Sequence, residues 1–305
     1  MLAVWEVCMN WLNAFELMCY LIVALMLVDL IRKKDYDSLF TFGSAALVGF
    51  IMELLAVAVT DIYYYNDAFW LSLGRVPKQF PVFGGFMWGG LTGYGIKLAQ
   101  KLRFGKKMTA LTAGMLIVTM DLLLDVVAIR LDGGFWTWVG NPINLEITQH
   151  TFMSVIWVNF LGYMIETPTV VLMTLRKREK VETTDWKSQT IWMFKIAFGA
   201  IGVTAAGSLL ALLLNMVTDD WFACIAFLVI WFVMAVKIIR QAIAIRPRIA
   251  KVSSWNIPTV IFWLAMYGYC LAGIVALAIQ KTHLWFLAAG ILFAAVTLGL
   301  CVAED

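Results

Sequence analysis

The chain has 305 residues, of which 62% are hydrophobic and only 14% are charged, and its formal net charge is +3. This composition, with a mean hydropathy of +0.85, excludes a soluble globular domain, and nothing in it points to a nucleic-acid partner. Apolar runs of about 20 residues, the length that crosses a bilayer, recur along the chain. We therefore predict an all-α, polytopic transmembrane helical bundle, which is a multi-pass integral membrane protein.

Nine apolar runs are long enough to be membrane spans. They cover roughly Trp5–Ile31, Leu39–Thr60, Pro81–Leu98, Met108–Ile129, Gln149–Leu175, Gln189–Met216, Trp221–Ile243, Ile257–Gln280 and Leu284–Val302.

The loops between these runs alternate in charge. Basic residues cluster at positions 32–34, 101–107, 176–187 and 240–251, whereas the intervening loops are acidic or nearly neutral. Because cytoplasmic loops carry the excess of lysine and arginine, we place the N-terminus outside and the C-terminus inside.

The first span carries a polar stripe. Glu6, Asn10, Asn13 and Glu16 are spaced three or four residues apart and so share one helical face. We expect this face to form hydrogen bonds with other helices, or else to line a site.

Two acids lie one helical turn apart in the fourth span. Asp121 and Asp125 stand at i and i+4, on one face of the helix. An ionisable group at the centre of a membrane helix costs at least about 2.5–3.5 kcal/mol, which predicts a buried site. Since the second and fourth spans both run outward, we expect Glu53 in the same outer half of the membrane.

The two outer loops next to these acids are rich in aromatic residues. Such residues also form belts at membrane interfaces, so the group is either a lid over the acids or such a belt. Its members are Tyr63, Tyr64, Tyr65, Phe69, Trp70, Trp136 and Trp138.

Other polar residues carry less information. Glu166 lies two residues before Pro168, and we interpret it as repairing a helix kink there. The two histidines, His150 and His283, are far apart, and the five cysteines lie in apolar runs without a ligand spacing. We expect neither a metal site nor a cofactor.

The composition changes near the charged segment 176–188. Residues 1–175 form five spans with acidic, amide and aromatic side chains, whereas residues 189–305 form four spans that are mostly aliphatic. We interpret residues 1–175 as the half that carries the site, 176–188 as a cytoplasmic linker, and 189–305 as support or as a surface for a membrane-protein partner or a second copy.

A series of motifs between residues 53 and 163 resembles the integral-membrane carotenoid hydratase family of bacteria and archaea, which includes bisanhydrobacterioruberin hydratases. In chain order the motifs are Glu53, Tyr63-Tyr64-Tyr65, Val76-Pro77, Pro81, Trp88, Asp121-Leu-Leu-Leu-Asp125, Phe135-Trp136-Thr137-Trp138 and Asn159-Phe160-Leu161-Gly162-Tyr163.

The resemblance implies a carotenoid-biosynthesis enzyme of a prokaryotic cell membrane, a lyase that hydrates an isoprenoid end group without a cofactor. Hydration of an isolated alkene begins with protonation to a tertiary cation. One carboxyl of a buried, adjacent pair such as Asp121 and Asp125 can supply that proton while the other is ionised. Glu53 is then expected to take a proton from the attacking water. The expected substrate-binding residues, which shield the cation or orient groups, are Tyr65, Trp88, Trp136, Trp138 and Asn159.

Other functions are open. The same acids could protonate a polyene that then cyclises, as a terpene cyclase does. Buried acids also suit a proton-coupled transporter or a lipid-binding subunit that is not an enzyme. An intramembrane prenyltransferase would use an Asp-x-x-x-Asp motif to hold magnesium and pyrophosphate, but the chain has only one such motif.

Overall fold

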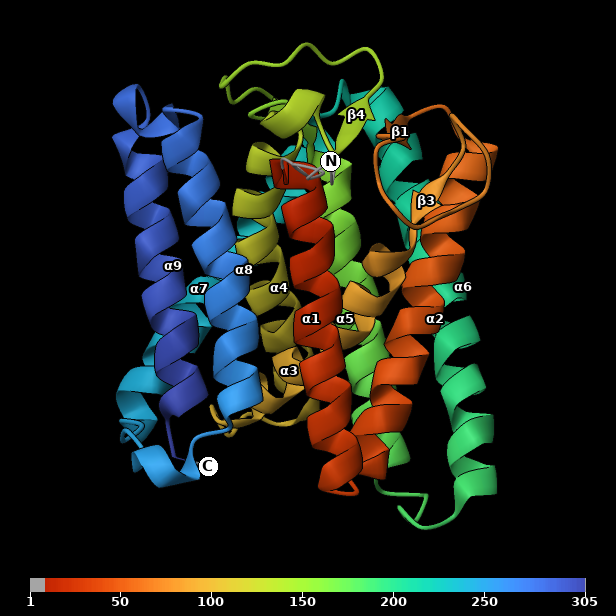
Figure 1. The fold of residues 1–305 in the computed structure, drawn as a ribbon, viewed down its shortest axis with the longest axis vertical. Helices are drawn as coiled ribbons and strands as arrows, with labels where there is room; N and C mark the ends of the chain where they lie inside the picture. Colours follow the sequence, from red (N-terminus) through yellow and green to blue (C-terminus); the bar gives the residue numbers. More distant parts are fainter. Residues whose placement is uncertain (1–8, 305) are drawn as a thin grey trace, which may run out of the picture.

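The computed structural model describes residues 9–304, and these form an all-α polytopic bundle whose nine long helices run alternately up and down (Figure 1). Eight of the nine are long and apolar enough to cross a membrane, which confirms the predicted class. The helices are α1 (Trp11–Arg32), α2 (Tyr36–Val59), α3 (Val82–Gln100), α4 (Lys106–Ala128), α5 (Trp157–Lys177), α6 (Trp186–Thr218), α7 (Trp221–Ile245), α8 (Ile257–Ala276) and α9 (Leu284–Val302).

Short strands and single helical turns occupy the loops. The strands are β1 (Tyr63–Tyr65), β2 (Ser72–Leu73), β3 (Phe80–Pro81), β4 (Trp136–Trp138), β5 (Thr151–Phe152) and β6 (Val155–Ile156), and the 3-10 turns are Leu131–Gly133, Val252–Ser254 and Ile279–Lys281. They form three antiparallel pairs, β1 with β4, β2 with β3, and β5 with β6.

The predicted boundary of the fifth span is wrong by eight residues. The apolar run from Gln149 does not enter the helix directly but first forms the β5–β6 hairpin, and α5 begins only at Trp157. Met153 and Ser154 make the turn of this hairpin with φ values of 49° and 72°, a left-handed conformation that interrupts a helix. The first span also starts later than expected, at Trp11, after the Asn10 cap; Glu6 lies outside the described residues.

The four basic loops all lie at the end of the bundle that also holds the C-terminus, whereas the N-terminal end of α1 is at the opposite end (Figure 1). The positive-inside rule assigns the basic end to the cytoplasm. We call it the inner end and the opposite one the outer end.

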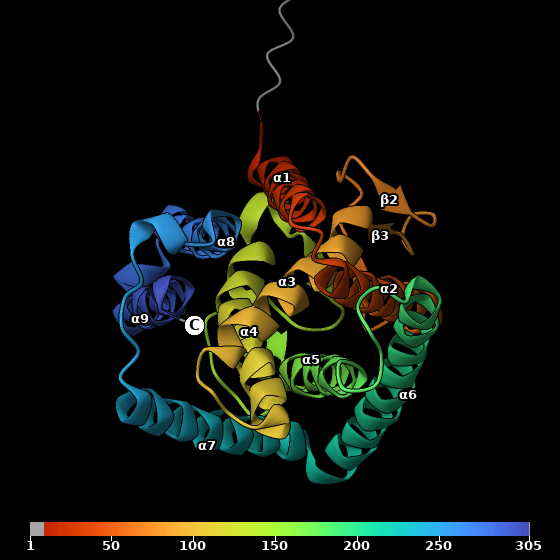
Figure 2. The ribbon, with the colours of Figure 1, turned by 90° about the horizontal axis from the view of Figure 1, so that it is seen from below.

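Helices α3, α4 and α5 lie inside a ring that the other six described helices form (Figure 2). In the apolar 18-residue stretch of α4 that could span a membrane, 94% of the residues are buried. Helix α3 is the one described long helix that is not apolar enough to count as a span by composition, because six of its 19 residues are glycine. Those glycines let neighbouring side chains lie directly on its backbone: Phe50 covers Gly85, and Phe262 of α8 covers Gly90.

A glycine of α2 likewise lets a side chain of α3 lie directly on the α2 backbone. A Cβ atom added at Gly49 of α2 would lie 2.3–2.7 Å from three side-chain atoms of Trp88, including its Cβ. We expect Gly49→Ala to lower the free energy of unfolding by about 1–3 kcal/mol, the typical cost of overpacking. Chemical denaturation in detergent measures this. Gly268→Ala in α8 is the matched control, because nothing lies within 4 Å of its added Cβ and alanine favours a helix. An equal loss in both variants would contradict the packing argument.

The two halves inferred from composition share one bundle. Helix α8 packs against α1 and α4, and α6 packs against α2 and α5. Large apolar side chains of α6 and α7 are exposed on the faces that point away from the bundle, among them Phe198, Leu209 and Phe232. Such faces are expected where helices contact lipid.

At the inner end, a buried ion network joins three helices. The Lys177 ammonium, whose side chain is 1% exposed, lies 2.7 Å from a carboxylate oxygen of Asp37 in α2, and Arg178 Nε lies 2.6 Å from the other. Lys177 also donates to the Gln189 side chain of α6 at 2.8 Å. The segment 176–188 that we interpreted as a linker therefore contains two residues, Lys177 and Arg178, that fix α5 to α2 and α6.

The polar stripe of α1 binds a loop rather than another helix. The buried Glu16 carboxylate accepts hydrogen bonds from the backbone N–H groups of Trp70 and Leu71, at 2.7 and 3.0 Å. Asn13 donates to the carbonyl of Ala68 at 3.1 Å. For Asn13 and Glu16, the expected helix–helix hydrogen bonds are thus replaced by contacts that hold the outer loop 61–80 against the bundle.

Candidate functional site

A cavity of about 90 Å³ lies in the outer half of the bundle, beneath the outer loops. A volume of this size holds several water molecules. The residues that we predicted from sequence as a site all line it, namely Glu53, Tyr65, Trp88, Asp121, Asp125, Trp136, Trp138 and Asn159. They come from α2, α3, α4, α5, β1 and β4, so the fold brings together six separate segments.

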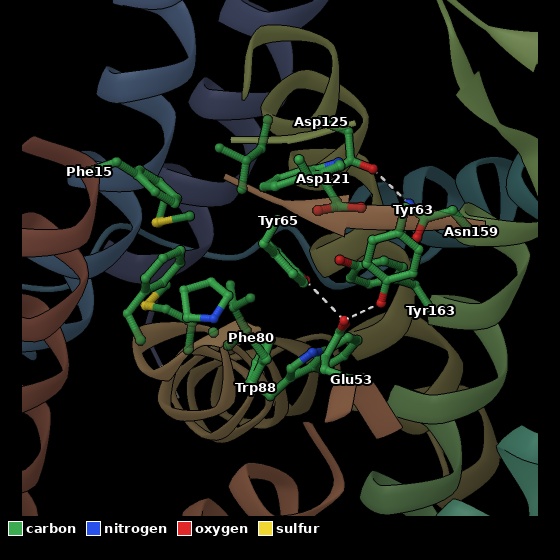
Figure 3. Close-up of a pocket in the computed structure, with 18 of the residues that line it drawn as sticks. Phe15, Glu53, Tyr63, Tyr65, Phe80, Trp88, Asp121, Asp125, Asn159 and Tyr163 are labelled. Atoms are coloured by element: carbon green, nitrogen blue, oxygen red, sulfur yellow. Dashed lines mark hydrogen bonds between the residues drawn. The ribbon is translucent and has the colours of Figure 1, made fainter. Parts of the chain in front are cut away.

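Both aspartates project from α4 into this cavity and both are 2% exposed (Figure 3). The Asn159 side-chain amide of α5 donates a hydrogen bond to Asp125 Oδ2 at 2.6 Å. Asp121 lies beside Asp125, but its Oδ2 is buried and has no hydrogen-bond partner. An amide N–H favours the ionised form of the carboxylate that it contacts, so Asn159 favours ionised Asp125, while the Tyr163 hydroxyl lies against Asp121.

Glu53 faces the aspartates from α2 and is held by two tyrosines. Tyr63 and Tyr65 both donate to its Oε2 atom, at 2.5 and 2.9 Å (Figure 3). Burial, followed by the charge of Glu53, raises the pKa of both tyrosines well above the usual range. Both hydroxyls are therefore protonated donors at neutral pH, and they fix the position of the Glu53 carboxyl.

The aromatic residues of the two outer loops form a paired lid. Strands β1 and β4 place Tyr63 opposite Trp138 and Tyr65 opposite Trp136, with ring centroids 5.0 and 6.0 Å apart. Such cross-strand aromatic pairs stabilise a short ladder. The indole N–H of Trp138 is buried without a partner, so it is available to a ligand oxygen. Tyr64 and Trp70 are exposed and do not line the cavity.

The prediction missed several lining residues. Tyr163 follows Asn159 by four residues and so shares its helical face; that spacing could have identified it. Phe15 of α1, Phe80 of β3 and Met266 of α8 also line the cavity. Met266 corrects the expectation that the first five spans alone build the site, because α8 closes one side of it. No periodicity in the sequence shows which face of α8 meets α4.

Among residues 9–304, no lysine, arginine or histidine lines the cavity. Arg130 follows α4, but its guanidinium binds the backbone carbonyls of Val126, Asn144 and Met153. Burial lowers the pKa of Arg130 to about 10, so it is still charged at neutral pH and anchors the loop after β4. Within residues 9–304, no group of three or more His, Cys, Asp or Glu side chains is arranged to hold a metal ion.

Glu166, on the same helix as Asn159 and Tyr163, is a further buried acid. Its Oε1 has no hydrogen-bond partner, and the expected repair of the kink at Pro168 is not seen, since none of its side-chain atoms bonds to described backbone. A buried polar group without a partner costs about 1–3 kcal/mol. We therefore expect Glu166→Met to raise the free energy of unfolding by a similar amount, measured by denaturation in detergent. A lower stability would mean that this carboxyl has a stabilising partner.

Three comparisons, with protein-family models, with curated proteins and with solved structures, found no match to this chain. The resemblance to carotenoid hydratases therefore stays a prediction, and the geometry of the cavity is the basis for a functional proposal.

Proposed function

We propose that this protein is a membrane enzyme that protonates a C=C bond of an isoprenoid, carotenoid-like lipid and then adds water to the resulting cation. The observation that carries the proposal is the cavity itself, in which a carboxyl pair and a third carboxyl face one another between aromatic walls. Acids supply and accept protons, and aromatic faces stabilise a cation without reacting with it. The natural setting would be a prokaryotic cell membrane.

In this mechanism Asp121 donates the proton. Its Oδ2 atom has no hydrogen-bond partner among residues 9–304, so a proton on that atom can be directed at a bound alkene. Asp125, hydrogen-bonded to Asn159, is the ionised member that stabilises the cation. Glu53 lies across the cavity (Figure 3) and takes a proton from the attacking water.

A pyrophosphate substrate fits this cavity poorly. Enzymes that bind pyrophosphate surround it with cations, either metal ions or arginine and lysine side chains. The lining residues include no basic side chain, and within residues 9–304 no group of three or more acidic, histidine or cysteine side chains is arranged to hold a metal ion. The geometry therefore favours an uncharged hydrocarbon substrate over the prenyl pyrophosphate that an intramembrane prenyltransferase would require.

The test uses purified protein in lipid bilayers with an acyclic carotenoid and ¹⁸O-labelled water. Mass spectrometry of the extracted lipid distinguishes the candidate functions. A product that gains one labelled water supports hydration, whereas an isomer of unchanged mass supports cyclisation by the same acids. An unchanged polyene would contradict both reactions. It would favour a proton-coupled transporter or a lipid-binding subunit, with the exposed faces of α6 and α7 as a surface for a partner or a second copy.

A further inference from the structure

The phenol of Tyr163 lies between the two groups of acids. It projects from α5 into the cavity, and its hydroxyl faces the Asp121 carboxyl (Figure 3). Its ring stacks on Trp88, with centroids 4.8 Å apart and planes at 28°. The electrostatic neighbours of its hydroxyl include Asp121, Asp125 and Glu53. Tyr163 is thus held rigidly at a point that both sides of the site can reach.

Hydration as proposed leaves the protons on the wrong side of the cavity. When the alkene is protonated, the Asp121 O–H bond breaks and a C–H bond forms. When water attacks, a C–O bond forms, and one water proton passes to Glu53. The substrate has then gained one water with no change in redox state. Asp121 is left as a carboxylate and Glu53 as a carboxylic acid, so one proton must return across the cavity before the next turnover.

Few groups can carry that proton. A relay group must accept a proton on one lone pair while it donates its own, as a hydroxyl does and an indole or a primary amide does not. Tyr63, Tyr65 and Tyr163 supply the hydroxyls among the lining residues. The first two donate to Glu53 and belong to its side of the cavity. Tyr163 is the hydroxyl that faces the aspartates.

We propose that Tyr163 returns the proton from Glu53 to Asp121. Its oxygen accepts a proton that arrives from Glu53 through cavity water, while its own proton passes to the Asp121 carboxylate. This inference rests on the proposed function, which requires such a return in each cycle. Tyr163 acts through Asp121 and is not itself the acid, so its loss should affect the recovery of the enzyme more than its first reaction.

Tyr163→Phe tests the proposal, because it removes the hydroxyl and keeps the stack on Trp88. We expect the first turnover of the pre-equilibrated variant to proceed near the wild-type rate. Later turnovers should be slowed about 10²-fold, within the range for lost proton transfer, with KM unchanged. Tyr267→Phe is the matched control, since that buried hydroxyl bonds Thr297 away from the cavity. If the first and later turnovers of Tyr163→Phe slow equally, or neither slows, the proton-return role is wrong.

A second measurement needs no substrate. Infrared spectra resolve the C=O stretch of a protonated carboxyl group, and loss of the band in Asp121→Asn identifies it as that of Asp121. After transfer to D₂O, we expect the Asp121 band to exchange at least about 10-fold more slowly in Tyr163→Phe than in wild type. An unchanged exchange rate would overturn the proton link even if hydration were established. Conversely, slowed exchange in a protein that adds no water would support the link while the hydratase function fails.

Discussion

Replacing Asp121 by asparagine should abolish the hydration of an acyclic carotenoid, with a loss of about 10²–10⁴-fold in turnover. Asparagine has the shape of aspartate but cannot act as a general acid, and loss of such a group typically costs this much. The carboxyl is 2% exposed, so bulk water cannot replace it as the proton source. The measurement is the rate of product formation, by mass spectrometry, for equal amounts of folded protein.

The control for this prediction is Asp67→Asn. Asp67 is an exposed acid of the same outer loop that carries the tyrosines, and it does not line the cavity, so its variant should retain wild-type turnover. If Asp121→Asn hydrates the substrate at the wild-type rate, the acid step has been assigned to the wrong group. Equal losses in both variants would indicate a general defect rather than a missing proton.

The largest effect on stability is expected for Asp37→Ala at the inner end. Lys177 is 1% exposed and pairs with Asp37, so removal of the carboxylate leaves a buried ammonium with only the neutral Gln189 as a partner. Breaking a buried ion pair in this way costs about 3–5 kcal/mol. Chemical denaturation of the protein in detergent, followed by tryptophan fluorescence, gives the change in the free energy of unfolding.

Two further variants separate a charge effect from a loss of packing. The double variant Asp37→Ala, Lys177→Met removes both charges and should recover most of the stability, since uncharged replacements of a buried pair are often neutral. Lys33, whose side chain is 53% exposed, forms a surface ion pair with Asp29. Lys33→Ala breaks this pair and should cost at most about 1 kcal/mol. A double variant no more stable than Asp37→Ala would contradict the charge argument.

Much of this fold could be predicted because a bilayer restricts what a sequence can do. Runs of apolar residues located all nine long helices of residues 9–304, and the four basic loops lie together at one end of the bundle, as their alternation along the chain predicts. Composition failed where apolar residues serve another structure. Residues 149–156 directly precede the apolar run of α5 and were included in the predicted span, but residues 151–156 form a hairpin, because Met153 and Ser154 adopt left-handed backbone conformations that hydropathy does not record.

The candidate site could be assembled in part for a similar reason. Asp121 and Asp125 are conspicuous because acids are expensive in a membrane span, and helical spacing placed them on one face. The pairing of Tyr63 with Trp138 joins strands more than 70 residues apart. Each strand has only three residues, and their sequence alone does not identify the partner strand. Met266 was missed because hydropathy gives the length of a helix and not its rotation against its neighbours.

The glycines of α3 also bear on how this protein enters the membrane. Glycine contributes almost nothing to the partitioning of a helix into lipid, and Lys97 and Gln100 near its inner end oppose it. Taken alone, α3 is therefore a poor substrate for the insertion machinery, yet it forms the wall that carries Trp88. Phenylalanine side chains of α2 and α8 cover the backbone of α3 at its glycines. We infer that α3 is held in the bilayer by its packing against α2 and α8 rather than by its own hydropathy.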